Sequence, residues 1–276
     1  MAMLVSDLVH PTAIIDPEAI IAPSVQIGPY TIIEGPVEIG PDCVIEGQAC
    51  ITGPLTMGSE NYVGHGAILG KSPQHRGYRG EQTSVRIGNQ NVFRELVTVN
   101  RGTAQGTGET WIGDRNLFMI GSHVGHDARI GNGCNVVNYA LIAGHAILDD
   151  GCILSGHSAV QQRVRIGRLA MLGGISATSK DIPPFVLQQG LNCVTGLNII
   201  GLRRAGCPPR NIDAVKQAFR IYFCEGNNRP SALDRIEAEF GSFPEVMEFI
   251  DFIRQSKNGI NQFRSKDSGQ SSHRMI

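Results

Sequence analysis

The chain has 276 residues, with 24 lysines and arginines against 25 aspartates and glutamates, and its formal net charge is −1. This balance argues against a nucleic acid as partner. No apolar run reaches the roughly 18 residues of a membrane-spanning helix, and the first residues lack the features of a signal peptide. Seven cysteines without a framework spacing are typical of the reducing cytoplasm, where we expect the protein to act.

A large apolar side chain recurs at every sixth position in two long runs, and a small or medium side chain usually follows four places later. A hexad of this kind describes one short strand and a turn. Three hexads close a triangular coil of about 18 residues, and coils stack by parallel strand pairing. The runs predict a β-solenoid over residues 1–194, and they comprise Val9, Ile15, Ile21, Ile27, Ile33, Ile39, Ile45, Ile51, Met57, Val63, Leu69, and then Ile112, Phe118, Val124, Ile130, Val136, Ile142, Leu148, Leu154, Val160, Ile166 and Leu172.

Polar stretches near 70–86 and 100–111 break the hexads, and we expect both to be loops that leave the coil. After the repeat fades, apolar residues recur at spacings of three and four. This pattern predicts a small α-helical domain over residues 195–264, with Ser231 and Ser242 as N-caps. The polar tail at 265–276 is expected to be disordered.

The stretch "SHVGHDARIG" places the polar residues that suggest chemistry. Because positions 18 apart stack, His126, Gly144 and Gln162 form a column, and His145 lies beside it on the next coil. His126 is a candidate general base, and Asp127 can orient its ring if a turn brings the two side chains together. His157 falls on another side and is expected to face solvent. Two alternatives stay open: a buried core histidine, and a zinc site made by His123, His126 and His145.

The segments "RELVTVNRGT", "SHVGHDARIG", "LIAGHAILDD", "DIPPFVLQQG" and "GLNIIGLRRAG" follow one another in an order that resembles the acyl-carrier-protein-dependent UDP-N-acetylglucosamine O-acyltransferases of lipid A biosynthesis. The resemblance covers most of residues 9–260. It implies a left-handed parallel β-helix and a homotrimer with active sites between subunits. It also implies the first step of lipid A biosynthesis: transfer of a (3-hydroxy)acyl chain from acyl carrier protein to the 3-position of UDP-N-acetylglucosamine or a close UDP-aminosugar, without metal or bound cofactor.

The resemblance assigns roles to individual residues. His126 would be the general base, Asp127 would hold it, and the Gly144 amide would stabilise the oxyanion. The positions that would bind substrate are Gln74, His75, Tyr78, His123, His145, Gln162, Gly174, Asn198 and Arg204. Gly174 lies where the family measures the acyl chain. Two interpretations stay open for the arginines that cluster in the second half of the chain, which are a basic patch for the acidic carrier protein and an ordinary solvated face; they are Arg163, Arg165, Arg168 and Arg210, together with Arg203 and Arg204.

The sequence departs from the family pattern at several sugar-side positions, so the identity of the sugar, with a 3-hydroxyl or a 3-amino group, stays open. "PQHRGYRG" has His75 and Gly77 where the family has an acid and a lysine, and Asn100 and Gln161 stand in for histidines. Ile200 and Ala205 replace an acid and an arginine. Three rival functions remain: a coenzyme-A-dependent sugar acetyltransferase, a zinc enzyme like the γ-carbonic anhydrases, and a non-catalytic solenoid.

Overall fold

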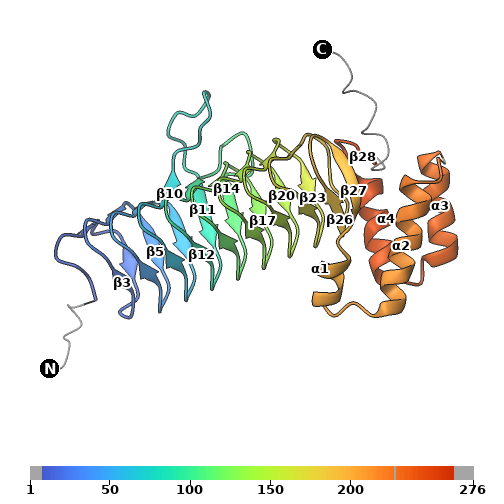
Figure 1. Ribbon diagram of the computed structural model, residues 1–276. Coiled ribbons are helices and arrows are strands. Elements are labelled where there is room, and N and C mark those ends of the chain that lie inside the picture. Colours follow the sequence, from blue (N-terminus) through green and yellow to red (C-terminus); the bar gives the residue numbers. More distant parts are fainter. Residues whose placement is uncertain (1–7, 227, 264–276) are drawn as a thin grey trace, which may run out of the picture.

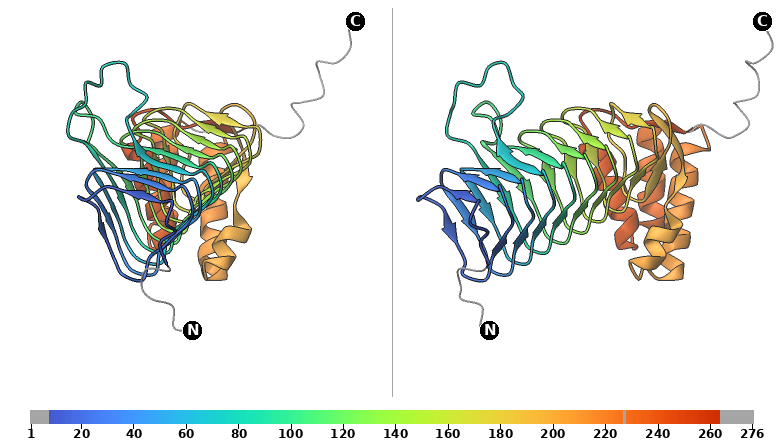
Figure 2. Two further views of the ribbon diagram at one scale, coloured as in Figure 1. Left: turned by 90° about the vertical axis from the view of Figure 1, so that its left-hand side faces the viewer. Right: turned by 60° about the vertical axis from the view of Figure 1, so that its left-hand side comes forward.

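Residues 8–226 and 228–263, described by a computed structural model, form a parallel β-coil whose last turn is covered by helices (Figure 1). Seen close to its axis, the coil is triangular (Figure 2). Each side of the triangle is one parallel sheet, because hydrogen-bonded partners in successive coils are usually 18 residues apart, as Ile14 and Ile32 are. The hexad prediction is confirmed. The predicted tail at 265–276 lies outside the described residues.

Within the described ranges, the three sheets contain nine, eight and eleven strands, and each takes every third strand of the coil. The nine-stranded sheet comprises β1 (Ile14–Ile15), β4 (Ile32–Glu34), β7 (Cys50–Thr52), β10 (Ile68–Lys71), β13 (Thr98–Asn100), β16 (His123–Val124), β19 (Leu141–Ile142), β22 (Ala159–Val160) and β25 (Ala177–Thr178). The eight-stranded sheet comprises β2 (Ile20–Ile21), β5 (Val37–Ile39), β8 (Leu55–Met57), β11 (Ser84–Ile87), β14 (Glu109–Ile112), β17 (Arg129–Ile130), β20 (Ile147–Leu148) and β23 (Arg165–Ile166).

The eleven-stranded sheet completes the triangle and continues into the C-terminal part. It comprises β3 (Gln26–Ile27), β6 (Val44–Ile45), β9 (Tyr62–Val63), β12 (Val92–Phe93), β15 (Leu117–Phe118), β18 (Asn135–Val136), β21 (Ile153–Leu154), β24 (Met171–Leu172), β26 (Val186–Gln188), β27 (Cys193–Leu197) and β28 (Gln262–Phe263). The β26 and β27 strands are antiparallel, and β28 pairs with β27. Because β27 crosses residue 194, the predicted domain boundary falls inside a strand.

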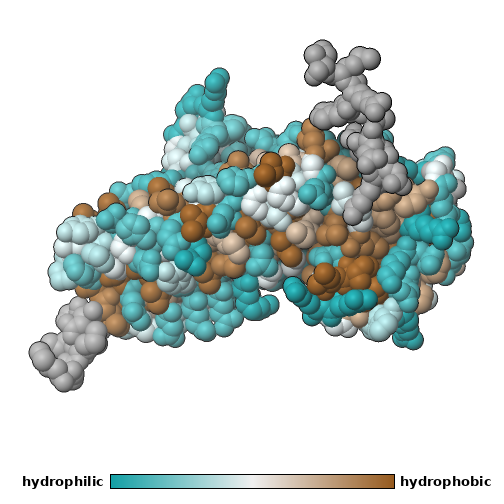
Figure 3. All heavy atoms as spheres, in the orientation of Figure 1, coloured by the Kyte–Doolittle hydropathy of each residue, from teal (hydrophilic) through white to brown (hydrophobic). Residues whose placement is uncertain are grey.

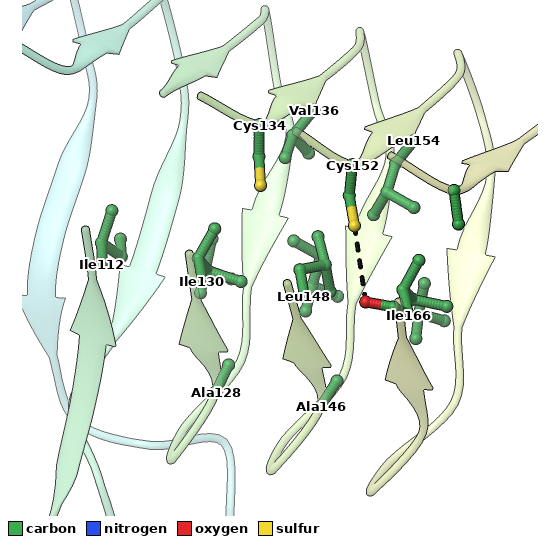
Figure 4. Packing of buried hydrophobic residues seen from close by; sticks show 14 of the residues in the cluster. Ile112, Ala128, Ile130, Cys134, Val136, Ala146, Leu148, Cys152, Leu154 and Ile166 are labelled. Atoms are coloured by element: carbon green, nitrogen blue, oxygen red, sulfur yellow. Dashed lines mark hydrogen bonds between the residues drawn. The ribbon is translucent and has the colours of Figure 1, made fainter. Parts of the chain in front are cut away.

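The hexad side chains form the core of the coil, where equivalent residues of successive coils stack into rows (Figure 4). Ile112, Ile130, Leu148 and Ile166 make one such row, and each is at most 1% exposed. Small side chains fill the narrow spaces near the corners, and Ala128, Ala146, Cys134 and Cys152 are the labelled examples in Figure 4. Burial of these rows against one another is the main favourable term that holds the coil together.

Both predicted loops leave the coil, although they are shorter than the sequence indicated. The first excursion, residues 72–83, lies between β10 and β11 and projects from the coil in Figure 1; the second excursion, residues 101–108, lies between β13 and β14. The strands at their roots stay in parallel register, since Val85 pairs with Leu55 and Thr110.

The helices are α1 (Ile199–Arg204), α2 (Pro209–Phe223), α3 (Arg229–Phe240) and α4 (Pro244–Gln255). The predicted caps Ser231 and Ser242 are wrong. The N-cap residues of α3 and α4 are Asn228 and Phe243, neither of which makes a side-chain cap bond. Pro230 in the first turn of α3 lacks an amide hydrogen that a cap would bind, and the Phe243 side chain of α4 has no acceptor, so both helices begin without a side-chain cap bond. None of the helices among the described residues has both the length and the hydropathy needed to cross a bilayer.

Candidate active site

His126 and Asp127 lie at the corner between β16 and β17, and the turn there places both side chains on the same side. Asp127 has a φ of 59°, a left-handed conformation that reverses the usual alternation of neighbouring side chains. The Nδ1 atom of His126 lies 2.8 Å from Oδ2 of Asp127. Both residues are buried, with 6% and 2% exposure. The contact predicted for a corner is therefore present.

The second excursion holds the Asp127 carboxylate in place. Its oxygens accept hydrogen bonds from the Thr103 amide at 3.1 Å, the Thr103 hydroxyl at 2.7 Å and the Thr107 amide at 2.9 Å. Burial alone would raise the pKa of Asp127, but the hydrogen bonds from His126 and Thr103 outweigh it and lower the pKa. An ionised carboxylate only accepts hydrogen bonds, so Nδ1 of His126 donates, and in the neutral ring Nε2 then carries the lone pair. Neither threonine is predicted from the sequence, because both lie in a segment without the hexad period.

Gly144 of the next coil faces the Nε2 atom of His126. A Cβ atom at Gly144 would lie 2.6 Å from Nε2, closer than real contacts allow. The amides on either side are used in the coil, since Ala143 donates to Val160 and His145 donates to His126. In the part of the chain that the structure describes, the Gly144 amide has no backbone acceptor. The His126 ring and the backbone of Gly144 therefore lie close together.

Gly144→Ala is expected to lower kcat by at least about 10-fold, because the added methyl group must displace the His126 ring, and displaced catalytic groups lose positional rate enhancement. The coil should still form, since Gly144 does not have a positive φ. The matched control is Gly156→Ala, where the nearest atom to a new Cβ would be 3.6 Å away. Equal kcat values for the two variants would contradict the close approach of Gly144 to His126.

Three further imidazoles surround this pair. The His145 ring centroid lies 5.0 Å from that of His126, and its Nε2 lies 3.8 Å from Asp127. His75, from the first excursion, has its centroid 5.6 Å from that of His126. The Nδ1 atom of His123 lies 2.8 Å from the Thr98 hydroxyl. Burial lowers the pKa of both His123 and His145, so both favour the neutral form.

These pKa shifts predict that acidification destabilises the fold. The folded pKa values of His123 and His145 lie below the usual 6.5, so the unfolded chain binds more protons as the pH falls past that value. Their contribution to the free energy of unfolding is complete above about pH 6.5 and is lost as the pH falls through the pKa values of the folded state. The lowered pKa of Asp127 acts in the same direction below about pH 4. Urea unfolding from about pH 8 to about pH 5 checks this. His123→Asn should show a shallower fall; identical curves would contradict the assignment.

A cleft of about 490 Å³ opens beside the pair. Five of the residues expected at the site line this cleft: Gln74, His123, His126, Gly144 and Gln162. The hydrophobic residues Leu141, Ile142 and Ala143 complete its wall, with Thr98, Asn100 and Gly125. Leu141 and Ala143 follow from the strand register, because Thr98, His123 and Leu141 are hydrogen-bonded neighbours. The cleft therefore brings the His126 ring together with polar side chains and with three hydrophobic residues of β19 and its corner.

Other predicted substrate residues lie outside the lining of this cleft. The Tyr78 hydroxyl of the first excursion donates to the Glu81 carbonyl at 2.8 Å and accepts from Arg101 of the second excursion at 3.0 Å. Gly174 is exposed at a corner, and Arg204 is exposed at the end of α1. Asn198 is the N-cap of α1, where its Oδ1 accepts from the Gly201 amide at 2.8 Å. One chain thus brings together only part of the predicted substrate set.

The possible metal ligands in the structure differ from the three histidines that the sequence offered as a zinc site. Among the described residues, the group with ligand atoms close enough to share a metal is His126, Asp127 and His145, not His123. Nδ1 of His123 is engaged with the Thr98 hydroxyl. The oxygens of Asp127 already accept several hydrogen bonds, which a metal would have to break. The arrangement fits a proton-transfer pair better than a metal site.

The arginines of the predicted basic patch fall into two groups, because some contact the helical part and the others are exposed. The guanidinium of Arg168 binds both carboxylate oxygens of Glu248 in α4, at 3.0 and 2.7 Å. The Arg165 guanidinium lies 4.5 Å from the centre of the Phe252 ring. Both arginines therefore hold α4 against the coil. Arg163 and Arg210 are exposed, as are Arg203 and Arg204.

Comparisons with known proteins agree with this architecture. A family model described as bacterial transferase hexapeptide repeats matches residues 18–53 and 109–144, and a model described as domain 2 of UDP-N-acetylglucosamine O-acyltransferase matches residues 181–261. The solved UDP-N-acetylglucosamine acyltransferase of Bacteroides fragilis is 39% identical, with a TM-score of 0.88 and coverage of 92% of this chain and all of that chain. The Moraxella catarrhalis O-acyltransferase is 37% identical, with a TM-score of 0.87 and the same coverages. The coil is accordingly a left-handed parallel β-helix.

A curated relative from Anaeromyxobacter sp. (strain Fw109-5), named acyl-[acyl-carrier-protein]–UDP-N-acetylglucosamine O-acyltransferase, is 45% identical over 255 residues. The alignment covers 92% of this chain and 99% of that relative. The hexapeptide repeats, the C-terminal helical part and the curated relative all indicate the same family. The chain belongs to the acyl-[acyl-carrier-protein]–UDP-N-acetylglucosamine O-acyltransferase family.

Proposed function

We propose that the protein transfers a (3-hydroxy)acyl chain from acyl carrier protein to the 3-position of UDP-N-acetylglucosamine or a close UDP-aminosugar, the first step of lipid A biosynthesis. The observation that supports this most is the His126–Asp127 pair, whose free Nε2 faces the Gly144 amide in the cleft. The names of the relatives supply the donor and acceptor classes.

The chemistry follows from the positions of these groups. Nε2 of His126 removes the proton from the acceptor group at the 3-position as that group attacks the thioester carbonyl. The Gly144 N–H donates to the oxyanion of the tetrahedral intermediate, where charge develops. Collapse of the intermediate breaks the carbon–sulfur bond, and the departing thiolate takes the proton from the imidazolium. Asp127 stabilises the imidazolium throughout.

We propose a homotrimer in which a neighbouring copy completes the substrate site. Tyr139 and Leu141 are 48% and 49% exposed, and Ile175 is 86% exposed, a concentration of apolar surface that suits an interface between copies. Figure 3 displays further apolar surface where the coil meets α1. Gly174, Asn198 and Arg204, which lie outside the cleft of one chain, are the residues that a second copy would supply. Sedimentation should give a trimer, and a monomer that turns over normally would contradict it.

The exposed arginines Arg163 and Arg210 are the remaining candidates for an acidic carrier protein, with Arg203 and Arg204. Arg165 and Arg168 serve mainly to attach α4. If the carrier binds this surface, kcat/KM for the acylated carrier should fall steeply with salt. We propose a cytoplasmic location, which the seven free cysteines support.

The decisive experiment is mass spectrometry of products from a panel of acyl carrier proteins and UDP-sugars, with acetyl-CoA as the rival donor. Acyl transfer from the carrier to a UDP-aminosugar is the expected result. Transfer only from acetyl-CoA would replace the proposal by a coenzyme-A-dependent acetyltransferase. Gly174 offers no side chain, so we expect longer carrier-linked chains to be accepted.

A further inference from the structure

The Oδ2 atom of Asp127 lies near two histidines but is hydrogen-bonded to only one of them. Nδ1 of His126 lies 2.8 Å from it, whereas Nε2 of His145 lies 3.8 Å from it, beyond hydrogen-bonding distance. The two rings are nearly perpendicular, at 86°. Burial lowers the pKa of His145, so this ring would approach the carboxylate as a neutral N–H donor. The two imidazoles are therefore rivals for one carboxylate oxygen.

Thr103 of the second excursion fills the remaining acceptor capacity of that oxygen. Its hydroxyl donates to Oδ2 at 2.7 Å, and its amide nitrogen lies 3.1 Å from both carboxylate oxygens. A carboxylate oxygen offers about two lone-pair sites, and on Oδ2 these are taken by the Thr103 hydroxyl and by His126. The other oxygen, Oδ1, accepts from the Thr107 amide at 2.9 Å. His145 consequently finds no free acceptor site on the oxygen that faces it.

The second excursion also prevents the carboxylate from turning away from this arrangement. Thr103 is 1% exposed and Asp127 is 2% exposed, so water cannot replace the donors of the loop. A Cβ atom at Gly106 would overlap the Asp127 carboxylate, which shows how closely the loop backbone packs on it. A buried carboxylate is stable only where donors are present, and these donors have fixed positions. The orientation of Asp127 is therefore set by the loop.

We infer that Thr103 is a positioning residue, whose hydroxyl directs the Asp127 carboxylate to His126 and excludes His145 from it. The role of His126 as base rests on the proposed function, whereas the pairing concerns the protein without substrate. Without the hydroxyl, Oδ2 regains a free lone-pair site, to which the Nε2–H group of His145 can donate. Asp127 is then shared between two rings, and His126 is held less firmly in the orientation that proton transfer needs.

Thr103→Val removes the hydroxyl and keeps both the shape of the side chain and the amide donor. We expect kcat to fall roughly 10- to 100-fold with little change in KM, because a misplaced base slows proton transfer without weakening substrate binding. Nitrogen and proton NMR of the labelled imidazoles, recorded without substrate, should show a hydrogen on Nε2 of His145 that is shifted downfield by a hydrogen bond to Asp127. The wild type should lack this signal. Thr103→Ser restores the hydroxyl and should restore both kcat and the wild-type spectrum.

The matched control is Thr31→Val, which removes another buried hydroxyl, one that donates to the Glu46 carbonyl at 3.0 Å in a coil before the first excursion. It should retain wild-type kcat and leave the His145 spectrum unchanged. If Thr103 were merely structural, Thr103→Val would lower the thermal unfolding midpoint and kcat without a new signal from His145. That result, or a failure of Thr103→Ser to restore kcat, would overturn the inference.

The wild-type spectrum tests the pairing even if Thr103→Val does not fold. A downfield hydrogen on Nε2 of His145, in place of one on Nδ1 of His126, would overturn the inference without any variant. Absence of acyl transfer to all UDP-sugars would overturn the proposed function, while the spectra would still decide the pairing. Acyl transfer together with an unchanged His145 spectrum in Thr103→Val would overturn the inference alone.

Discussion

His126→Ala is expected to lower kcat by about 10²- to 10⁴-fold, the contribution usual for a positioned general base. The loss should appear in kcat and in kcat/KM, because the proton is transferred only in the transition state. The thermal unfolding midpoint should change little, since Asp127 keeps its hydrogen bonds to Thr103 and Thr107 when the imidazole is removed. Steady-state kinetics and calorimetry on the same preparation separate the two effects.

The matched control for this variant is His65→Ala, which removes an exposed imidazole from a coil far from the cleft. It should retain wild-type kcat. Activity of His126→Ala near the wild-type level would remove His126 from the role of base and would leave His145 or His75 as the next candidates, since their rings are its nearest aromatic neighbours.

Asp127→Asn is expected to lower kcat by about 10³- to 10⁴-fold, as substitution of the aspartate does in comparable histidine–aspartate pairs. The new amide nitrogen would donate to Nδ1 of His126, which would force the hydrogen onto Nε2 and remove the basic lone pair from the cleft. Asparagine tolerates the positive φ at this corner, so the fold should persist. The loss would then reflect the tautomer and not the backbone.

The tautomer itself is measurable. Nitrogen NMR of the labelled imidazole should place the hydrogen on Nδ1 in the wild type and on Nε2 in Asp127→Asn. Asp213→Asn, which alters an exposed carboxylate paired with Lys216 on α2, should change neither kcat nor the tautomer. Wild-type kcat in Asp127→Asn would mean that the carboxylate does not orient the base.

The sequence was sufficient to predict the coil because its stabilising contacts repeat with the chain. Each apolar residue of a hexad packs on its equivalents one coil away, so the period that predicts a strand also predicts its neighbours. The same 18-residue step predicts that Gly144 lies one coil from His126, and the structure brings the two residues together. Residues in the regular coil therefore have positions that sequence spacing determines.

The excursions and the helical part do not repeat, and their contacts depend on tertiary structure. Thr103 reaches Asp127 across 24 residues that include a break in the period, and Arg168 finds Glu248 across 80 residues. No local pattern encodes such pairings, because loop geometry and helix docking select them among many sterically allowed partners. The sequence by itself thus determined the β-helix and the column of His126 and Gly144. Only the tertiary structure decided how the Asp127 carboxylate is held and which arginines remain exposed.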